Sequence, residues 1–564
     1  MAVMYSKIKS VQYLVALMKA HNIRHVVLSP GGRNIPINHS LEQDEFFDCY
    51  SVVDERSAAY FALGLAKQFQ EPVAICCTSS VAASNYLPAI TEAFYLHVPL
   101  LVLTSDRHPY MLDQMENQMI DQVDMYKNFC KLCVKLPMVV NADDEWYCQR
   151  KINEAILELC HHGAGPVQID IPIAGEIGMY TEPELPKVKV IKRLEYKRQE
   201  SEWKEKLAEL KEAKRILVVC GEQGMPGKDL SEAISKFGKK YNCVIATEKV
   251  SNVAGTGVLE LFGAAQVIPP DKFNAEYKPD IVISFGGNFV SRIKDLLRAR
   301  HEDVTHWLID ESGSICDVFK CLTTVFECTP LDFFEYFASG AGLTMSNNRK
   351  YYDLWAEYAK SAEYPEFDYS NSYAIKALSS KIPAGSLMHL GILNATRIMS
   401  HCKTAEDITA YSNIGAFGID GSMSTFVGQS VAAPDKLAFL VIGDLSFFYD
   451  MNALQIRHLG KNVRIMMINN SGAAEFHFFM GEKVIPTLNR HIAAEHFTSA
   501  EGWVRTKNFK YLSAHSAEEF DQNLPEFVKE DSDVPIFFEV FTDKKADAEK
   551  LKAFYAKFKP PVKK

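Results

Sequence analysis

Two short motifs in the last third of the chain carry the oxygen-bearing side chains that a divalent cation prefers. They are Gly443-Asp-Leu-Ser446 and Asn469-Asn-Ser-Gly472, and each directly follows an apolar run typical of a buried strand. The carboxylate of Asp444 and the carboxamide of Asn470 can coordinate one hard cation through oxygen atoms. A helix that begins near Ser446 would direct its first N–H groups at a phosphate. Together the motifs indicate a magnesium and diphosphate site; either one alone would also suit a strand, a turn and a helix capped by aspartate.

The spacing of the two motifs identifies the cofactor more closely. Asn470 lies 26 positions after Asp444. In the sequence motif of thiamine-diphosphate enzymes, Gly-Asp and Asn-Asn are separated by about 25–30 residues. Gly443 has the freedom that a close approach of the backbone to a ligand needs. The spacing therefore predicts thiamine diphosphate and Mg²⁺ as the cofactors.

A glutamate in the first third of the chain is placed to act on such a cofactor. Glu55 follows the apolar run Tyr50–Val53, so it stands where a strand is expected to end. The aminopyrimidine ring of thiamine diphosphate needs a carboxylate beside N1′, where a shared proton prepares the cofactor for loss of its reactive proton. The alternative for a lone Asp-Glu-Arg sequence is an ion pair at the surface.

Strand-like and helix-like segments alternate along the chain, which is typical of parallel α/β domains. In the first third, three apolar runs end in the polar turns Ser29-Pro-Gly-Gly-Arg33, Thr78-Ser-Ser80 and Thr104-Ser-Asp-Arg107. Ligand sites of open α/β sheets form at such carboxyl ends of strands. The polar residues of these turns are therefore candidates for contact with a ligand.

Two breaks divide the chain into domains of similar size. A proline-rich and charged segment covers residues 180–206, and a polar, aromatic segment covers residues 346–372. Segments of this kind are typical of linkers. We therefore expect three parallel-sheet α/β domains and a charged tail, at residues 1–182, 205–345, 372–545 and 546–564.

Composition and charge exclude several classes of protein. The 564 residues include 61 Lys and Arg against 71 Asp and Glu, and the formal charge of −10 disfavours binding to nucleic acid. A hydrophobic share of 47% excludes a disordered chain. The apolar stretches are far shorter than the ~20 residues of a membrane span, and the first helix is amphipathic, unlike a secretion signal. Thirteen scattered cysteines suit a reducing compartment, so we expect a cytoplasmic protein that acts on small molecules.

An ordered series of motifs extends this pattern over nearly the whole chain. Its members are Ser29–Arg33, Asp54–Arg56, Thr78–Ser80 with Asn85 and Pro88, Thr104–Pro109, Asn117–Gln122, Gly418–Gly421 and Gly443–Phe447. The series resembles the family of SEPHCHC synthase, the menaquinone-pathway thiamine-diphosphate enzyme that makes 2-succinyl-5-enolpyruvyl-6-hydroxy-3-cyclohexene-1-carboxylate. The resemblance implies the fold of the thiamine-diphosphate decarboxylases, with a pyrimidine-binding, a middle and a diphosphate-binding domain. It also implies a homodimer or a dimer of dimers, in which Glu55 faces the cofactor held by the partner subunit.

The resemblance also assigns roles to individual residues. The metal would be held by Asp444, Asn470 and the carbonyl of Gly472. The cofactor would be contacted by Glu55, Ser79, Ile419, Gly443, Asp444, Leu445, Ser446 and Asn470. The substrate pocket would be lined by Arg33, Arg107, Gln118, Arg397 and Phe476. Any one of these arginines could instead be a cation at the surface or at an interface.

The chain departs from the family pattern in the substrate pocket. Gly32 replaces a serine, and Arg292-Ile293 stands in place of a Lys-Arg pair in the middle domain. Ile414 occupies the position of a substrate-binding arginine, and Phe417 adds bulk close to it. The residues predicted to bind the cofactor are all present.

A further departure follows the Asn-Asn motif. Where the family has glycines and then Ile-Phe, this chain has Ala473-Ala-Glu-Phe476, which introduces the carboxylate of Glu475. Glu475 and His477 are candidates for an acid and a base beside the reacting centre. His477 is equally compatible with a buried histidine whose hydrogen bonds are satisfied.

These observations predict an enzyme, a Mg²⁺- and thiamine-diphosphate-dependent decarboxylase that acts as a carboligase. Because Ile414 is apolar and Glu475 is negative, a second carboxylate on the donor would meet a repelling surface. We therefore expect a short-tailed 2-oxo acid donor such as pyruvate and an anionic or hydroxylated acceptor. The alternatives are a genuine SEPHCHC synthase that uses 2-oxoglutarate and isochorismate, and a non-catalytic binding protein that keeps the fold. A Rossmann-type oxidoreductase is disfavoured, because Gly221–Gly227 lacks the spacing of a dinucleotide-binding loop.

Overall fold

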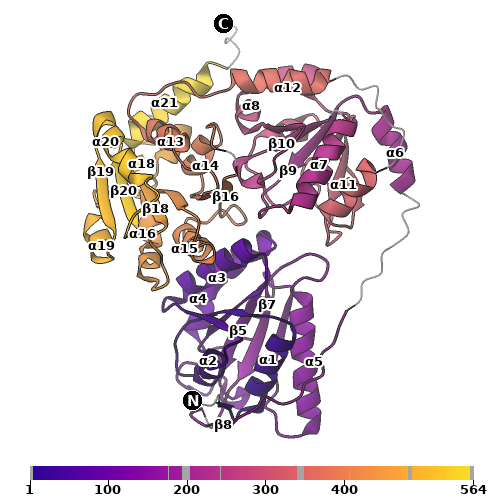
Figure 1. The fold of residues 1–564 in the computed structure, drawn as a ribbon, viewed down its shortest axis with the longest axis vertical. Helices are drawn as coiled ribbons and strands as arrows, with labels where there is room; N and C mark the ends of the chain where they lie inside the picture. The colour runs from indigo at the N-terminus through magenta and orange to yellow at the C-terminus, as the bar shows by residue number, and fades with distance from the viewer. Residues whose placement is uncertain are drawn as a thin grey trace. The chain divides into compact units, whose positions relative to one another are not determined.

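A computed structural model of the chain describes residues 4–175, 177–193, 203–241, 243–339, 349–405, 407–480 and 485–558 (Figure 1). It contains three six-stranded parallel sheets with helices between their strands. This arrangement confirms the predicted parallel α/β fold class. Of the two predicted linkers, residues 194–202 and 346–348 lie outside the described residues.

The chain forms two compact units, which are considered separately. The first contains Met1–Tyr196, Gly415–Pro434 and Asp450–Gly460, and the second contains Lys197–Ile414, Asp435–Tyr449 and Lys461–Lys564. The first unit carries one six-stranded sheet and the second carries two. Two segments from the last third of the chain therefore pack with the first third.

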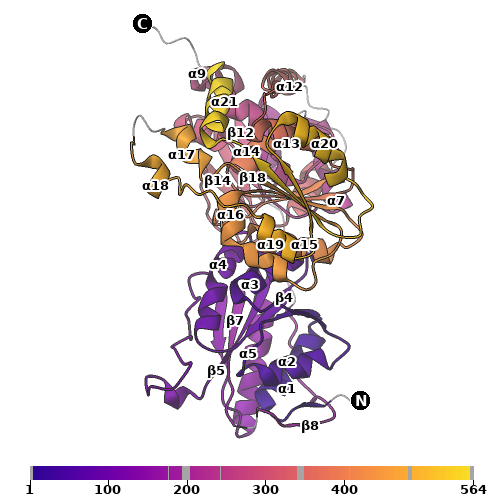
Figure 2. The same cartoon turned by 90° about the vertical axis from the view of Figure 1, so that its left-hand side faces the viewer.

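The sheet of the first unit has the strand order β3-β2-β4-β5-β7-β6. Its strands are β2 (His25–Leu28), β3 (Asp48–Ser51), β4 (Val73–Cys77), β5 (Leu100–Asp106), β6 (Leu132–Lys135) and β7 (Val167–Pro172). One face is covered by α1 (Lys9–Ala20), α2 (Ile35–Glu42) and α5 (Ala142–Glu158), and the other by α3 (Glu55–Phe69) and α4 (Val81–Tyr95) (Figure 2). Because both faces are covered, β4 and β5 are buried along their whole length. A short antiparallel pair, β1 (Tyr5–Ser6) and β8 (Tyr180–Glu182), completes the unit.

Helix α15 (Ser422–Ala432), from the last third of the chain, packs against α3 in the same unit. The two helices cross through a reciprocal pair of glycines. A Cβ atom on Gly64 of α3 would lie 2.0 Å from the carbonyl oxygen of Thr425, and a Cβ on Gly428 of α15 would lie 2.1 Å from that of Phe61. Only glycine allows this close approach of the two backbones.

The first sheet of the second unit has the strand order β11-β10-β9-β12-β13-β14. Its strands are β9 (Ile216–Cys220), β10 (Val244–Thr247), β11 (Val258–Glu260), β12 (Ile281–Phe285), β13 (Thr305–Ile309) and β14 (Leu322–Phe326). Its helices are α6 (Trp203–Glu212), α7 (Lys228–Tyr241), α8 (Phe262–Val267), α9 (Pro270–Lys272), α10 (Ile293–Ala299) and α11 (Pro330–Ala338), and α12 (Lys350–Ser361) follows them.

The loop Gly221–Gly227 follows β9, and its first glycine has a packing role. A Cβ on Gly221 would lie 2.0 Å from the carbonyl oxygen of Gly287. The amide of Glu222 donates to the carbonyl of Asn288 at 2.8 Å. Gly221 therefore serves the close packing of two neighbouring turns, and α7 begins only at Lys228.

The second sheet of this unit has the strand order β16-β15-β17-β18-β20-β19. Its strands are β15 (Leu387–Leu390), β16 (Thr409–Tyr411), β17 (Ala438–Gly443), β18 (Val463–Asn469), β19 (Lys510–Ala514) and β20 (Ile536–Phe541). The helices around it are α13 (Asn371–Ser379), α14 (Asn394–Met399), α16 (Asp444–Tyr449), α17 (Ala474–Phe479), α18 (Leu488–His491), α19 (Glu501–Thr506), α20 (Ala517–Phe527) and α21 (Lys544–Ala556).

The predicted charged tail, residues 546–564, begins inside α21. Leu551 and Phe554 of this helix are buried in the core of the second unit, so the helix is part of the folded structure. No helix among the described residues has the length and apolar character needed to span a membrane.

Candidate functional site

Asp444 lies at the point where β17 ends and α16 begins. It is 3% exposed, and its Oδ2 accepts a hydrogen bond from the amide of Gly472 at 2.9 Å. Its Oδ1 accepts from the amide of Leu445 at 2.7 Å. The helix starts at Asp444, two residues before the predicted position near Ser446, because the carboxylate satisfies one of the first free amides. The structure therefore brings Asp444 and Gly472 together.

Asn470 follows directly after β18 and is 7% exposed. Its amide nitrogen donates to Oδ2 of Asp547 at 3.0 Å. The backbone then turns sharply, with positive φ angles of 64° at Ser471 and 133° at Gly472. A Cβ at Gly472 would lie 2.5 Å from the carbonyl oxygen of Ala493, so the turn requires glycine.

These donors fit a hard divalent cation. Asp444 offers a carboxylate, Asn470 an amide oxygen and Gly472 a backbone carbonyl, and Mg²⁺ prefers such oxygen ligands. Among the described residues, no three His, Cys, Asp or Glu side chains come together in a way that could hold a metal. A cation at this loop would therefore depend on the amide and carbonyl oxygens as much as on the single carboxylate.

Three residues around this loop were not found from the sequence. Nε2 of His496 lies 3.1 Å from Oδ2 of Asp444. Nζ of Lys544 lies 2.7 Å from Oε1 of Glu495 and 3.3 Å from the carbonyl oxygen of Ser471. Neither contact has a local sequence signal, because both are made by residues more than 20 positions beyond the motif.

Glu55 is the first residue of α3 in the first unit. The strand before it, β3, ends at Ser51, two residues before the predicted end at Val53. Asp54 caps the helix by accepting from the amide of Ser57 at 3.2 Å. Burial raises the pKa of the Glu55 carboxyl, the backbone amide of Glu55 opposes that shift, and the nearby charge of Asp54 adds to it. A half-buried carboxyl of this kind is suited to exchanging a proton.

Two of the predicted substrate arginines are neighbours at the carboxyl ends of the first sheet. The guanidinium of Arg33 donates to the carbonyl of Ile173 at 3.1 Å. Arg107 pairs with Glu116, with 2.7 Å between Nη1 and Oε1. Burial lowers the pKa of Arg33, and the charge of Arg107 lowers it further. The charges of Glu116 and Asp106 oppose these two effects on the pKa of Arg33.

Ser79 and Gln118 also come together in the first unit. The hydroxyl of Ser79 donates to the carbonyl of Gln118 at 2.9 Å, and the side-chain amide of Gln118 donates to the carbonyl of Ser79 at 3.4 Å. Gln122 belongs to the motif Asn117–Gln122 but had no predicted role, and it is fully buried. It accepts from the amide of Ser80 at 3.1 Å and donates to Asp170 at 2.8 Å. Gln122 therefore holds the loop that carries Gln118 against the turn that carries Ser79.

Arg397 and Glu475 form a two-pronged ion pair in the second unit. Nη1 and Nη2 of Arg397 each lie 2.6 Å from one oxygen of Glu475. Nη1 also donates to Asn394 at 2.9 Å. The guanidinium and the carboxylate are 17% and 8% exposed. Burial works to lower the pKa of Arg397, but the hydrogen bonds and charge of Glu475 leave it above the usual value.

The other residues named in the sequence analysis occupy different environments. Nε2 of His477 lies 2.7 Å from Oδ1 of Asn489, and the ring is buried, which is the geometry of a satisfied core histidine. Phe476 is 37% exposed, and Ile414 is fully buried. In the first unit, Ile419 is half-buried just before α15.

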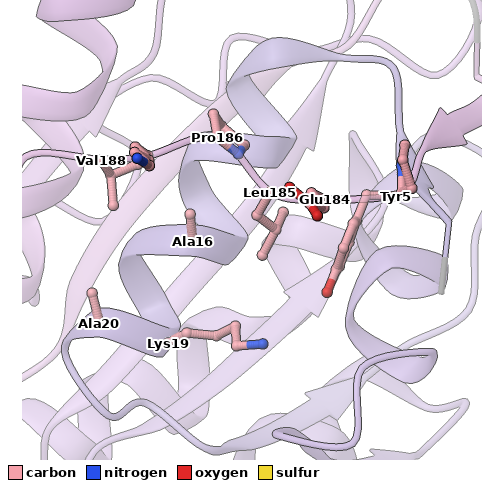
Figure 3. Close-up of a pocket in the computed structure, with 10 residues that line it drawn as sticks. Tyr5, Ala16, Lys19, Ala20, Glu184, Leu185, Pro186 and Val188 are labelled. Atoms are coloured by element: carbon pink, nitrogen blue, oxygen red, sulfur yellow. The ribbon is translucent and has the colours of Figure 1, made fainter.

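One open groove lies elsewhere in the first unit. It runs between α1 and the segment 183–188, and it is lined by Tyr5, Ala16, Lys19, Leu185 and Val188 among others (Figure 3). Lys19 and Tyr5 both contact Asp44 there, at 2.6 Å and 2.8 Å. None of the predicted site residues lines this groove.

Comparison with known proteins places these residues in a family. Residues 8–125 match the family described as thiamine pyrophosphate enzyme, N-terminal TPP binding domain. The 2-succinyl-5-enolpyruvyl-6-hydroxy-3-cyclohexene-1-carboxylate synthase of Phocaeicola vulgatus is 38% identical over 566 residues, 98% of this chain and 99% of the relative. The synthases of the same name from Bacteroides thetaiotaomicron and Flavobacterium johnsoniae are 37% and 31% identical, covering 99% and 95% of this chain and 100% and 97% of each relative. The resemblance drawn from the motifs is confirmed, as is the prediction of a thiamine-diphosphate-dependent enzyme. The chain belongs to the SEPHCHC synthase family of thiamine-pyrophosphate enzymes.

Proposed function

We propose that the protein is a Mg²⁺- and thiamine-diphosphate-dependent decarboxylase of 2-oxo acids that joins the remaining acyl group to an acceptor. Bound thiamine diphosphate would supply the electron sink for loss of CO2. Asp444, Asn470 and the carbonyl of Gly472 would hold the Mg²⁺. The contact of Asp444 with the amide of Gly472, in the tight turn that directly follows Asn470, supports the metal assignment.

Glu55 would hold and return a proton at N1′ of the cofactor's pyrimidine ring. Its raised pKa means that it keeps a proton more readily than an exposed glutamate. It is the first residue of α3, whose amino end is capped by Asp54. Both features suit a group whose task is proton exchange.

The Arg397–Glu475 ion pair supports the proposal that the donor is a short-tailed 2-oxo acid. An arginine binds a substrate carboxylate with the same two-pronged geometry that Arg397 already uses on Glu475. A donor with a second carboxylate would have to displace Glu475 and leave that buried anion unpaired. Losing one partner of a buried charge pair costs about 2–5 kcal/mol, or roughly 30-fold to several thousand-fold in affinity. A short-tailed donor such as pyruvate requires no displacement.

Arg33 and Arg107 would bind an anionic or hydroxylated acceptor. The guanidinium of Arg33 is held by a neutral carbonyl, and Nε of Arg107 is buried without a hydrogen-bond partner among the described residues. Both groups therefore keep hydrogen-bonding capacity or charge for a ligand.

The direct test is turnover of a panel of 2-oxo acids by the holoenzyme without an acceptor. CO2 release should be faster with pyruvate than with 2-oxoglutarate. Preferential turnover of 2-oxoglutarate, followed by addition to isochorismate, would instead support the alternative that this chain is a genuine SEPHCHC synthase, which the names of its relatives favour. Cofactor binding without turnover of any 2-oxo acid would support the remaining alternative, a non-catalytic binding protein.

The ion pair itself can be tested by Glu475→Gln. This change keeps the shape of the side chain but removes its charge, so Arg397 becomes available to a second carboxylate. The ratio of 2-oxoglutarate to pyruvate turnover should rise by about tenfold or more. Glu116→Gln is the matched control, because it frees Arg107 in the same way and should leave this donor ratio unchanged. An unchanged ratio in Glu475→Gln would contradict the donor assignment.

We also propose that the three sheets belong to domains at residues 1–182, 205–345 and 372–545, and that the protein is a homodimer or a dimer of dimers in which Glu55 acts on the partner's cofactor. Mixing inactive Glu55→Gln subunits with inactive Asp444→Ala subunits should then restore part of the activity. A catalytically active monomer in sedimentation would argue against this assembly.

A further inference from the structure

Each asparagine of the Asn-Asn motif is held through its amide nitrogen by a buried carboxylate from the end of the chain. Asn469 donates to Oε1 of Glu539 on β20 at 2.7 Å. Asn470 donates to Oδ2 of Asp547 on α21 at 3.0 Å. The motif lies about 70 residues earlier in the sequence than either carboxylate, so folding alone brings them together.

Asp547 is surrounded by neutral donors. It is 1% exposed. Its Oδ1 accepts from the amide of Asn371 at 2.9 Å, and its Oδ2 accepts from the hydroxyl of Thr542 at 2.7 Å as well as from Asn470. No Lys, Arg or His among the described residues lies within ion-pair distance of it. The buried carboxylate therefore depends on hydrogen bonds alone, and the amide of Asn470 is one of three.

This contact decides which end of the Asn470 amide faces a cation. A carboxylate without its proton only accepts hydrogen bonds, and an asparagine side chain has a donating NH2 and an accepting oxygen. The NH2 group is therefore drawn toward Asp547, which turns the oxygen the other way. A flipped amide would place its oxygen against the carboxylate and its NH2 against the cation, and both contacts are repulsive.

We propose that Asp547 is a positioning residue for the metal site, which fixes the amide of Asn470 so that its oxygen is presented to the cation. The proposal rests on the Mg²⁺ site of the proposed function. Supporting groups of this kind orient the ligands of metal sites, and their loss typically weakens metal binding by about 10- to 100-fold. In this protein the support comes from α21, the last helix that the structure describes.

The experiment measures Mg²⁺ affinity in the full-length protein, by the shift in thermal unfolding as Mg²⁺ is titrated at fixed thiamine diphosphate. Asp547→Asn keeps the size of the side chain but can donate to Asn470, which allows the Asn470 amide to flip. Mg²⁺ affinity should fall by about 10- to 100-fold. Thr542→Val is the matched control, because it removes one donor to Asp547 and leaves the contact with Asn470. Its Mg²⁺ affinity should stay close to that of the parent.

A swap of the two groups separates positioning from general stability. In the double variant Asn470→Asp with Asp547→Asn, the amide now stands on α21 and the carboxylate on the loop. The amide can donate to one carboxylate oxygen, and the other remains for Mg²⁺, which also accepts carboxylate ligands. Mg²⁺ affinity in the swap should recover from the loss in Asp547→Asn and exceed that of Asn470→Asp alone, in which two carboxylates face each other.

Three results would overturn the proposal. Asp547→Asn could lower the unfolding temperature without changing Mg²⁺ affinity, which would make its role structural only. The swap could fail to recover Mg²⁺ affinity, which would mean that amide orientation is not what Asp547 controls. The parent could show no Mg²⁺-dependent shift; in that case the metal site of the proposed function is itself wrong, and Asp547 has no ligand to position.

Discussion

The first sheet and the last sheet of this protein share one strand order but present different chemistry. Numbered along the chain within each sheet, both have the order 2-1-3-4-6-5, whereas the middle sheet has the order 3-2-1-4-5-6. In the 2-1-3-4 order the chain reverses direction across the sheet between the first and third strands, and ligand sites form outside the carboxyl ends there. In the first sheet these strands are β2 and β4, and in the last they are β15 and β17.

The loops at equivalent positions show the difference. After the third strand, the first sheet has Thr78–Ser80 and the last has Gly443–Ser446. After the fourth strand, the first sheet reaches Arg107, and the last reaches Asn470. One sheet thus presents cations and hydroxyls, and the other presents oxygens of the kind that a divalent cation prefers. The comparison teaches that the scaffold sets where a site can form and the loops set what it binds.

Equivalent helices also follow the second strands of the two sheets. Helix α3 follows the second strand of the first sheet, and α15 follows the second strand of the last. These two helices pack on each other through Gly64 and Gly428. Their amino ends are capped differently: α3 by its own Asp54, and α15 by Asp450, which accepts from both the amide and the hydroxyl of Ser424 at 2.7 Å.

The largest expected effect separates the roles of the two sheets. Glu55→Gln should lower turnover by about 10²- to 10⁴-fold, because it removes the proton-exchanging group. It should leave the stabilisation by thiamine diphosphate with Mg²⁺ nearly unchanged, since no ligand of the metal is altered. Turnover assays and thermal unfolding with and without cofactor measure the two quantities.

Asp444→Ala provides the contrast within the last sheet. It removes the carboxylate that holds the amide of Gly472 and would bind the metal. Cofactor stabilisation should therefore disappear in this variant. If Asp444→Ala bound the cofactor as tightly as the parent, the division of labour between the sheets would be wrong.

A smaller effect is expected where the equivalent helices cross. Gly64→Ala would place a Cβ 2.0 Å from the carbonyl oxygen of Thr425, so the backbones must move apart. Overpacking of this kind lowers the free energy of unfolding by about 1–3 kcal/mol, which urea unfolding can measure. Gly502→Ala in α19 is the control, because nothing lies within 4 Å of its Cβ position. That variant should be neutral or gain up to about 1 kcal/mol from helix propensity, and a loss equal to that of Gly64→Ala would show that the crossing is not special.

The smallest effect concerns the different caps of these helices. Burial raises the pKa of Asp450 to about 7, and its hydrogen bonds from Ser424 and the charge of Arg56 oppose the shift. An aspartate in the unfolded chain has a pKa near the model value of 3.8. Between these values the folded protein binds more protons at this group, so its contribution to stability is present at low pH and is lost as the pH rises through about 7.

Asp450→Asn should remove this contribution to the pH dependence. The free energy of unfolding, measured from about pH 4 to about pH 8, should fall less steeply with rising pH than in the parent. The two slopes should differ by at most the contribution of about one bound proton. Identical slopes in the parent and Asp450→Asn would contradict the pKa shift.

Much of the metal loop and of the fold class could be predicted from the sequence. An apolar run followed by small and polar residues specifies a strand and the turn at its end, and this information is local. Asp444 and Asn470 were found in this way, and the role of Gly472 was implied by the resemblance. The structure joins Asp444 to Gly472. Strand β4 ends at Cys77, directly before the turn Thr78–Ser80, as its apolar run indicated.

Only the tertiary structure decided how the charged groups pair. Glu475 faces Arg397 across 78 positions of sequence, and Asn470 faces Asp547 across 77. Glu475 was expected to add negative charge to the pocket, and the structure shows that this charge is already matched by an arginine. A side chain's type sets which contacts it can make, but which partner it meets depends on how distant strands and helices are brought together. The sequence by itself therefore determined which groups stand at the ends of the strands, and the packing of the sheets and α21 determined which of those groups are bound to each other and which are left for a ligand.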